Sequence, residues 1–341
     1  MGSEKIKSGY RSAFIAVILQ VILVFTVMFA VGKILNLYAA NKLVSNNSID
    51  ISEYVSSIKS EYSMIINAVV YSIADLLPVV IFMKLSKNKG KIGNWFGKSK
   101  ISLGQTALLG FSVLALAYLC SIGTSIFRFI FGSYNLPNSI SIGLKSDNKV
   151  VFAVTVLYVC LVGPFLEELL FRGFVLHETA CVNPVFGVIV SSTLFGLFHL
   201  SFEQAISATI IGILFGYIAL KANSIKPTVI LHIINNTYAC VRILFVDKIG
   251  ISTKFDDVIA VGIITIGVIV IVNFVYEQGR LVRNKDVLDT DNFIKDDVIK
   301  SIRKKEKRIS LGGRLAMSQL SFYFVYIVLF TVSVLEKFAV L

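Results

Sequence analysis

Nine long apolar stretches divide the chain, and they limit its fold more than any other feature. Its 341 residues are 55% hydrophobic and only 16% charged, with a mean hydropathy of +0.78. Apolar blocks of roughly 20 residues are too long for the core helices of a soluble domain, and they match the thickness of a bilayer. The predicted spans are residues 13–35, 64–85, 104–131, 150–177, 184–202, 204–221, 226–246, 257–276 and 316–337.

These stretches predict an all-α fold, a polytopic transmembrane helical bundle of about eight or nine spans. Ile, Val, Leu and Phe are spread evenly along each stretch instead of alternating with polar residues, so a membrane β-barrel is disfavoured. The count depends on the fifth and sixth stretches, which are hardly separated. No repeat and no Gly/Ser-rich or Pro-rich linker divides the chain, so we expect one membrane domain with peripheral loops.

The basic residues predict an orientation in the membrane and not a nucleic-acid partner. The net charge is +12, but the lysines and arginines lie in short loops between apolar spans and do not form a soluble basic face. Residues 84–103 and 277–315 are rich in them, which assigns both loops, and the N terminus, to the cytoplasm. Residues 277–315 also suit an amphipathic helix on the inner leaflet, so the lipid bilayer is an expected partner.

Ionisable residues inside apolar spans are the first candidates for function, because such side chains are costly in hydrocarbon. The fourth stretch carries Glu167, Glu168 and Arg172. Helix positions four apart are neighbours, so we expect Arg172 to neutralise Glu168, while Glu167 points roughly 100° away and is left to act as a general base. The alternative is that all three residues only join helices through buried ion pairs.

Two histidines lie in later stretches, each four residues from a partner on the same helix face. His199 follows Phe195, whose ring can back the imidazole, and His232 precedes Asn236. The second pair can donate hydrogen bonds to negative charge on a carbonyl oxygen, as an oxyanion site does. The alternatives are simple packing for His199 and interhelical hydrogen bonding for the second pair.

Residue counts place these groups at similar depths in the membrane. The fourth and fifth stretches are antiparallel neighbours, joined by a short turn near residues 181–184. At ~1.5 Å per residue, Glu167 and His199 lie roughly 18 and 22 Å from the same membrane face, and His232 and Asn236 about 9 and 15 Å from it. Helix tilt shifts such values by several ångströms. A polar cavity near mid-membrane is therefore geometrically permitted.

Three motifs, in this order, resemble those of the CPBP family, which groups CAAX prenyl proteases with bacteriocin-processing and Abi-type proteins. They are Glu-Glu-x-x-x-Arg at 167–172, Phe-x-x-x-His at 195–199 and His-x-x-x-Asn at 232–236. The flanking Pro164, Gly173 and Pro227 also resemble family members. The resemblance makes residues 150–246 the expected catalytic core, between about three N-terminal spans in residues 1–149 and C-terminal helices with a basic loop in residues 247–341.

The resemblance also implies roles for individual residues. Glu167 with His199 would activate a water for attack on a peptide carbonyl, while His232 and Asn236 would stabilise the oxyanion. The supporting residues would be Glu168 and Arg172. A rotated helix would instead leave Glu168 as the free carboxylate.

No cofactor is expected on this mechanism. Zinc is the alternative, because Glu167, His199 and His232 are residue types that can make a two-histidine, one-carboxylate site. The sequence has no His-Glu-x-x-His helix of the kind found in zinc proteases. A water activated by glutamate without metal also gives a role to Asn236, which is a poor zinc ligand.

The expected function is therefore that of an intramembrane endopeptidase acting on a membrane-associated peptide or protein. The second hypothesis is a non-catalytic CPBP/Abi-type membrane scaffold or bacteriocin-immunity protein that binds a partner through the same cavity. A transporter is disfavoured because inverted repeats are not evident. The Lys-, Ile- and Asn-rich composition suggests an AT-rich bacterium, hence the bacterial cytoplasmic membrane and a short peptide precursor as substrate.

Several polar residues belong to no motif. His177 is expected at the polar end of the fourth span, and Glu203 either orients the histidine one turn before it or lies in a loop. Asp75 either lines the cavity or pairs with Arg128 or Arg242. The four cysteines lack metal-ligand spacing and are expected to be buried apolar residues, at positions 120, 160, 181 and 240.

Overall fold

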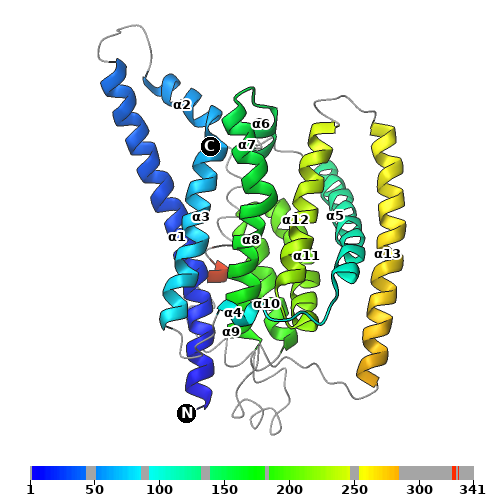
Figure 1. Cartoon of the computed structure of the whole chain (residues 1–341). Coiled ribbons are helices and arrows are strands. Elements are labelled where there is room, and N and C mark those ends of the chain that lie inside the picture. Colours follow the sequence, from blue (N-terminus) through cyan, green and yellow to red (C-terminus); the bar gives the residue numbers. More distant parts are fainter. Residues whose placement is uncertain are drawn as a thin grey trace.

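The described part of the chain is a bundle of long helices that run side by side (Figure 1). The computed structural model describes residues 2–43, 51–85, 92–131, 139–180, 184–245, 253–283, 325–327 and 329. Regular structure in these residues is helical throughout, which confirms the all-α prediction. The helices are α1 (Gly2–Leu43), α2 (Ile51–Glu61), α3 (Ser63–Leu85), α4 (Ile92–Trp95), α5 (Leu103–Phe131), α6 (Ser139–Lys145), α7 (Lys149–Leu157), η1 (Tyr158–Val162), α8 (Gly163–Glu168), η2 (Leu169–Val175), α9 (Leu176–Thr179), α10 (Pro184–Phe198), α11 (Phe202–Ala222), α12 (Lys226–Ile243) and α13 (Thr253–Arg283).

Within the described residues, six helices are long and apolar enough to cross a bilayer, so the predicted count of eight or nine spans is not confirmed. The six are Lys7–Asn41, Ser63–Lys84, Leu103–Ile130, Lys149–Thr179, Gln204–Ala222 and Phe255–Glu277. Helix α10 is apolar but has only 15 residues. Helix α12 has 18 residues, but it carries the polar groups of the candidate site. The ninth predicted span and the predicted surface helix after residue 283 lie almost wholly outside the described residues.

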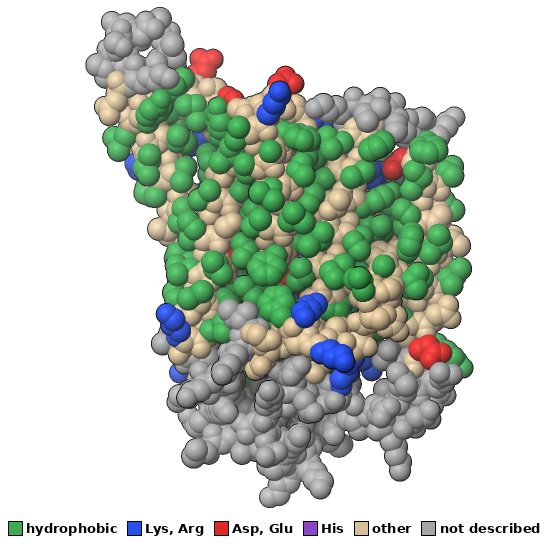
Figure 2. Space-filling model, viewed as in Figure 1, with side chains coloured by type: hydrophobic (Ala, Val, Ile, Leu, Met, Phe, Trp, Pro, Cys, Tyr) green, Lys and Arg blue, Asp and Glu red, His purple; other side chains and the backbone are tan. Residues whose placement is uncertain are grey.

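The outer surface has the polarity expected of a membrane protein. Large apolar side chains cover the middle of the bundle, and Lys and Arg side chains gather toward the end that holds the N terminus (Figure 2). Phe129 is 91% exposed and Phe29 68% exposed. Aromatic side chains left open to this degree over a whole band indicate a surface that contacts lipid and not water.

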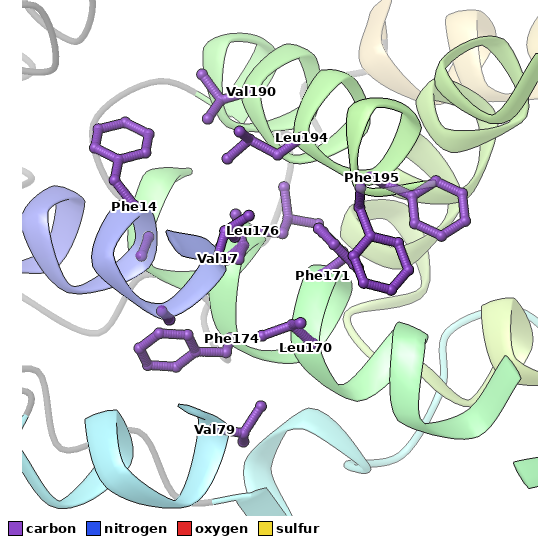
Figure 3. Close-up of a cluster of buried hydrophobic side chains, with 14 of the residues drawn as sticks. Phe14, Val17, Val79, Leu170, Phe171, Phe174, Leu176, Val190, Leu194 and Phe195 are labelled. Carbon is purple, nitrogen blue, oxygen red and sulfur yellow. The ribbon is translucent and has the colours of Figure 1, made fainter. Parts of the chain in front are cut away.

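The fourth span occupies the centre of the bundle and carries the acidic pair. It is one continuous helix in which two π-helical segments, η1 and η2, stand on either side of α8. Helices α1 and α3 pack on one side, and α12 contacts η1 and α8 on another. The main apolar core lies around η2 and α9, where Phe171 and Phe174 meet residues of α1, α3 and α10 (Figure 3).

Two tight connections hold the helices that carry the histidines. Leu200 has a φ of 54° in the turn between α10 and α11, and Asn223 has a φ of 53° after α11. Gly196 lets α10 and α11 approach at the backbone, because a Cβ there would overlap the Ala205 carbonyl oxygen. The α11–α12 turn is tied to α4, since Ile225 N–H donates to the Trp95 carbonyl over 2.9 Å.

The basic end of the bundle predicts which side of the membrane each loop faces. In a chain whose native cysteines are replaced, we expect an impermeant maleimide added to intact cells to label Ser60→Cys, in α2, and not Lys98→Cys, after α4. Both positions are exposed, at opposite ends of the bundle. Labelling after membrane permeabilisation controls for reactivity. Labelling of Lys98→Cys alone from outside would reverse the orientation.

Candidate active site

Glu168 and Arg172 form a buried ion pair inside the bundle, as their spacing predicted. Arg172 Nη1 donates to Glu168 Oε1 over 2.7 Å, and both side chains have 0% exposure. The guanidinium carbon lies 4.2 Å from the ring centroid of Phe195 and 5.3 Å from that of Phe215. Gly212 of α11 leaves room for the guanidinium, because an added Cβ would lie 3.1 Å from Arg172 Nη2. The positive charge is thus held between two aromatic faces.

His232 of α12 faces both glutamates. Its Nδ1 lies 3.1 Å from Glu168 Oε1, and its Nε2 lies 3.8 Å from Glu167 Oε2. A carboxylate accepts hydrogen bonds, so His232 donates its Nδ1–H to Glu168. The Glu167 side chain is 18% exposed, whereas Glu168 is enclosed. Glu167 is therefore the accessible carboxylate of the pair.

His199 ends helix α10 with its ring orientation fixed by the backbone. Its own N–H donates to the Gly196 carbonyl over 3.2 Å, and its Nδ1 lies 2.9 Å from the Phe195 carbonyl oxygen. Because a carbonyl oxygen only accepts, Nδ1 must carry the hydrogen. The neutral ring then presents Nε2 as a hydrogen-bond acceptor.

The ring of Phe195 lies between the two imidazoles. Its centroid is 5.1 Å from that of His199 and 5.8 Å from that of His232, and both contacts are nearly perpendicular. Phe171 packs on the same ring at 5.2 Å (Figure 3). One buried phenyl ring therefore touches both histidines and Arg172, and so the structure brings the second and third motifs to the ion pair.

Asn236 lies one turn after His232 and is bonded on both sides of its amide. Its Nδ2 donates to the Val159 carbonyl oxygen in η1 over 3.1 Å, and its Oδ1 accepts from Asn235 Nδ2 over 3.1 Å. One of its two N–H groups is thus used within the helix bundle. The other is the hydrogen that an oxyanion role would need.

Helix α3 contributes Asp75, for which the sequence left two alternatives, a place in the cavity or a pair with Arg128 or Arg242. Asp75 is 1% exposed and accepts a hydrogen bond from Gln20 Nε2 of α1 over 3.3 Å, so the pairing alternative is wrong. Arg242 binds Asp256 instead, at 2.6 Å. Asp75 interacts electrostatically with Glu167, as do the nearby tyrosines at positions 71 and 158. No spacing rule relates α1, α3 and α8, so the sequence could not choose between the two alternatives or identify Gln20 as the partner.

Two other polar residues belong to no motif. His177 lies in α9, at the end of the fourth span as expected, and is half-buried with its ring centroid 6.2 Å from that of Trp95. The Glu203 side chain lies outside the described part of the structure. Among the described residues, no three His, Cys, Asp or Glu side chains are grouped in a way that could hold a metal ion.

Comparison with known proteins points to the same segment. Residues 149–238, which contain all three motifs, match the family described as type II CAAX prenyl endopeptidase Rce1-like. A Bacillus subtilis (strain 168) protein named "Putative membrane peptidase YdiL" is 27% identical over 161 residues, which cover 42% of this chain and 62% of that protein. No solved structure matches the chain. Residues 149–238 are therefore similar to the CPBP/CAAX protease family, in the segment where the three motifs predicted it.

Proposed function

We propose that this chain is an intramembrane endopeptidase that hydrolyses a peptide bond in a membrane-associated peptide or protein, with Glu167 and His199 activating the water. One observation carries the proposal. A half-buried carboxylate lies 3.8 Å from the imidazole of His232, and the ring of Phe195 links that imidazole to His199 inside an apolar bundle. Ionisable groups inside a membrane are costly, so their presence there favours a functional role.

The reaction begins with a water between Glu167 and His199. Glu167 takes one proton from this water, while Nε2 of His199 accepts its second hydrogen as a hydrogen bond and orients the oxygen. The oxygen then attacks the carbonyl carbon of the substrate, and the C=O double bond opens to an oxyanion. Glu167 returns the proton to the amide nitrogen, the C–N bond breaks, and a carboxylic acid and an amine leave.

The oxyanion is stabilised by the second N–H of Asn236 and by Nε2–H of His232. Since His232 donates Nδ1–H to Glu168, a neutral ring would present Nε2 as an acceptor. An Nε2–H for the oxyanion therefore requires hydrogen on both ring nitrogens of His232. Glu168, paired with Arg172, holds the imidazole in place through Nδ1.

Replacing either group that handles the water should abolish cleavage. We expect Glu167→Gln or His199→Ala to lower the rate about 100- to 10,000-fold, because each removes a proton-handling group and leaves the fold intact. The measurement is mass spectrometry of membrane peptides from a host that expresses each variant, with the exposed Glu53→Gln as matched control. If the peptides from hosts that express Glu167→Gln or His199→Ala are the same as those from the wild type, the protease proposal is wrong.

The same variants separate the protease from a scaffold. If both variants keep the biological effect of the wild type while no peptide is cut, the chain acts as a non-catalytic CPBP/Abi-type or bacteriocin-immunity protein that binds its partner through the cavity. Cleavage that depends on Glu167 supports the protease. The expected substrate is then a short, membrane-associated precursor, and the expected location is the bacterial cytoplasmic membrane.

The buried ion pair should matter for folding more than for chemistry. Arg172→Leu leaves Glu168 without its main counter-charge, so we expect the free energy of unfolding to fall by about 3–5 kcal/mol. Glu168→Gln in the same chain should recover part of that loss, because it removes the unpaired charge. Thermal unfolding in detergent gives both values. If Glu168→Gln with Arg172→Leu is less stable than Arg172→Leu alone, the ion pair between these two residues is not what stabilises the fold here.

The proposed mechanism uses no metal, and zinc bound by Glu167, His199 and His232 is the alternative. We expect cleavage by the purified protein to persist after treatment with EDTA or 1,10-phenanthroline, since each proton transfer is assigned to a side chain. The catalytic assay is repeated with and without added Zn²⁺. Loss of cleavage on chelation that zinc restores would replace this mechanism with a metal-dependent one.

A further inference from the structure

A proline at the start of α8 leaves a carbonyl group of the central helix without a main-chain donor. In η1, the N–H of Gly163 donates to the Tyr158 carbonyl, five residues back. The Val159 carbonyl would next need either that N–H, which is already used, or the N–H of residue 164. Residue 164 is proline, which has no N–H. An unpaired carbonyl in an apolar interior costs free energy, so it needs a donor from elsewhere.

Asn236 supplies that donor from the neighbouring helix. Its Nδ2 lies 3.1 Å from the Val159 carbonyl oxygen, and α12 contacts η1 along this side. His232, one turn earlier on the same face of α12, contacts Glu167 and Glu168. Helix α12 thus holds the central helix at two levels, once at the π turn and once at the acidic pair.

The π turn determines which way the acidic pair faces. A π turn holds one more residue than an α-helical turn, so the residues that follow it are rotated by roughly 100° relative to an uninterrupted helix. Glu167 and Glu168 follow η1 directly, in α8. Loss of the turn would therefore move the carboxylates away from His232.

We propose that Asn236 is a positioning residue: its amide replaces the N–H that Pro164 lacks and so stabilises the π turn that presents Glu167 and Glu168 to His232. This role is separate from the oxyanion contact, which uses the other N–H. The stabilisation of the π turn by Asn236 does not depend on any activity of the protein. Its consequence for catalysis rests on the proposed function.

The hydrogen bond can be observed directly. Val159–Cys160 is the one Val-Cys pair in the sequence, so labelling with ¹³C-carbonyl valine and ¹⁵N cysteine isolates the Val159 carbonyl by NMR. We expect Asn236→Ala to move this carbonyl signal upfield, because its hydrogen bond is lost. Asn235→Ala is the matched control and should leave the signal in place. An unmoved signal in Asn236→Ala would overturn the proposal.

A double-mutant cycle tests the link to the proline. Asn236→Ala should lower Tm by about 2–4 °C, the scale of one lost hydrogen bond in a chain of this size. In a Pro164→Ala background the loss should be smaller, since the new N–H lets a main-chain donor reach the Val159 carbonyl in either register. An equal fall in Tm with Pro164 and with Pro164→Ala contradicts the proposal. If Asn236→Ala alone does not fold, we expect the double variant Pro164→Ala/Asn236→Ala to fold. A double variant that also fails to fold contradicts the proposal.

Positioning has its own signature in the histidine rings. The chain has 3 histidines, so ¹⁵N-histidine labelling gives three pairs of ring-nitrogen signals. We expect Asn236→Ala to shift the His232 ring nitrogens as the glutamates turn away, while those of His177 stay. An unshifted His232 would reduce Asn236 to a structural cap and overturn the positioning role. None of these measurements needs cleavage. If the hydrogen bond between Asn236 and the Val159 carbonyl is confirmed in a protein that cuts no peptide, the proposed function is refuted and the positioning role stands.

Discussion

The enclosed carboxylate of Glu168 is the group on which the candidate site depends. A single oxygen, Oε1, accepts from Arg172 over 2.7 Å and lies 3.1 Å from Nδ1 of His232. A charge buried this completely is stable only if its partners stay in place, so it fixes α12 against the central helix. Because Glu168 takes both partners, Glu167 keeps its exposed edge. Two adjacent residues of the same type thereby become an enclosed, paired carboxylate and an accessible one.

The sequence predicted the residues of this arrangement better than its geometry. The four-residue spacing paired Arg172 with Glu168 correctly, and the positions of the three motifs indicated that they lie at similar depth. Adjacent helix positions place Glu167 roughly 100° from Glu168, and His232 reaches both because each of its ring nitrogens faces one carboxylate. The direction in which the pair faces depends on η1, just before α8. Pro164 was the local signal, but a proline marks a missing donor without specifying the type of turn around it.

The span count, which is not confirmed, and the partner of Asp75, which was not predicted, are hard to read from the sequence for related reasons. Helices that line a polar interior carry polar side chains and can be short, so α10 and α12 lack the length or hydropathy by which spans are recognised. Asp75 and Gln20 are 55 positions apart, and their contact depends on how α1 and α3 are rotated against each other. Periodicity finds residues on one face of one helix. It does not find a pair formed between two faces.

The two histidines show how identical side chains acquire different hydrogen-bonding patterns. The Nδ1–H of His199 is bonded to a neutral carbonyl, which leaves an acceptor at Nε2. The Nδ1–H of His232 is bonded to a carboxylate, and a second carboxylate lies 3.8 Å from Nε2. In the proposed mechanism the first imidazole orients a water and the second stabilises an anion. That asymmetry comes from the partner of a single nitrogen in each ring, and so it is fixed before any substrate enters.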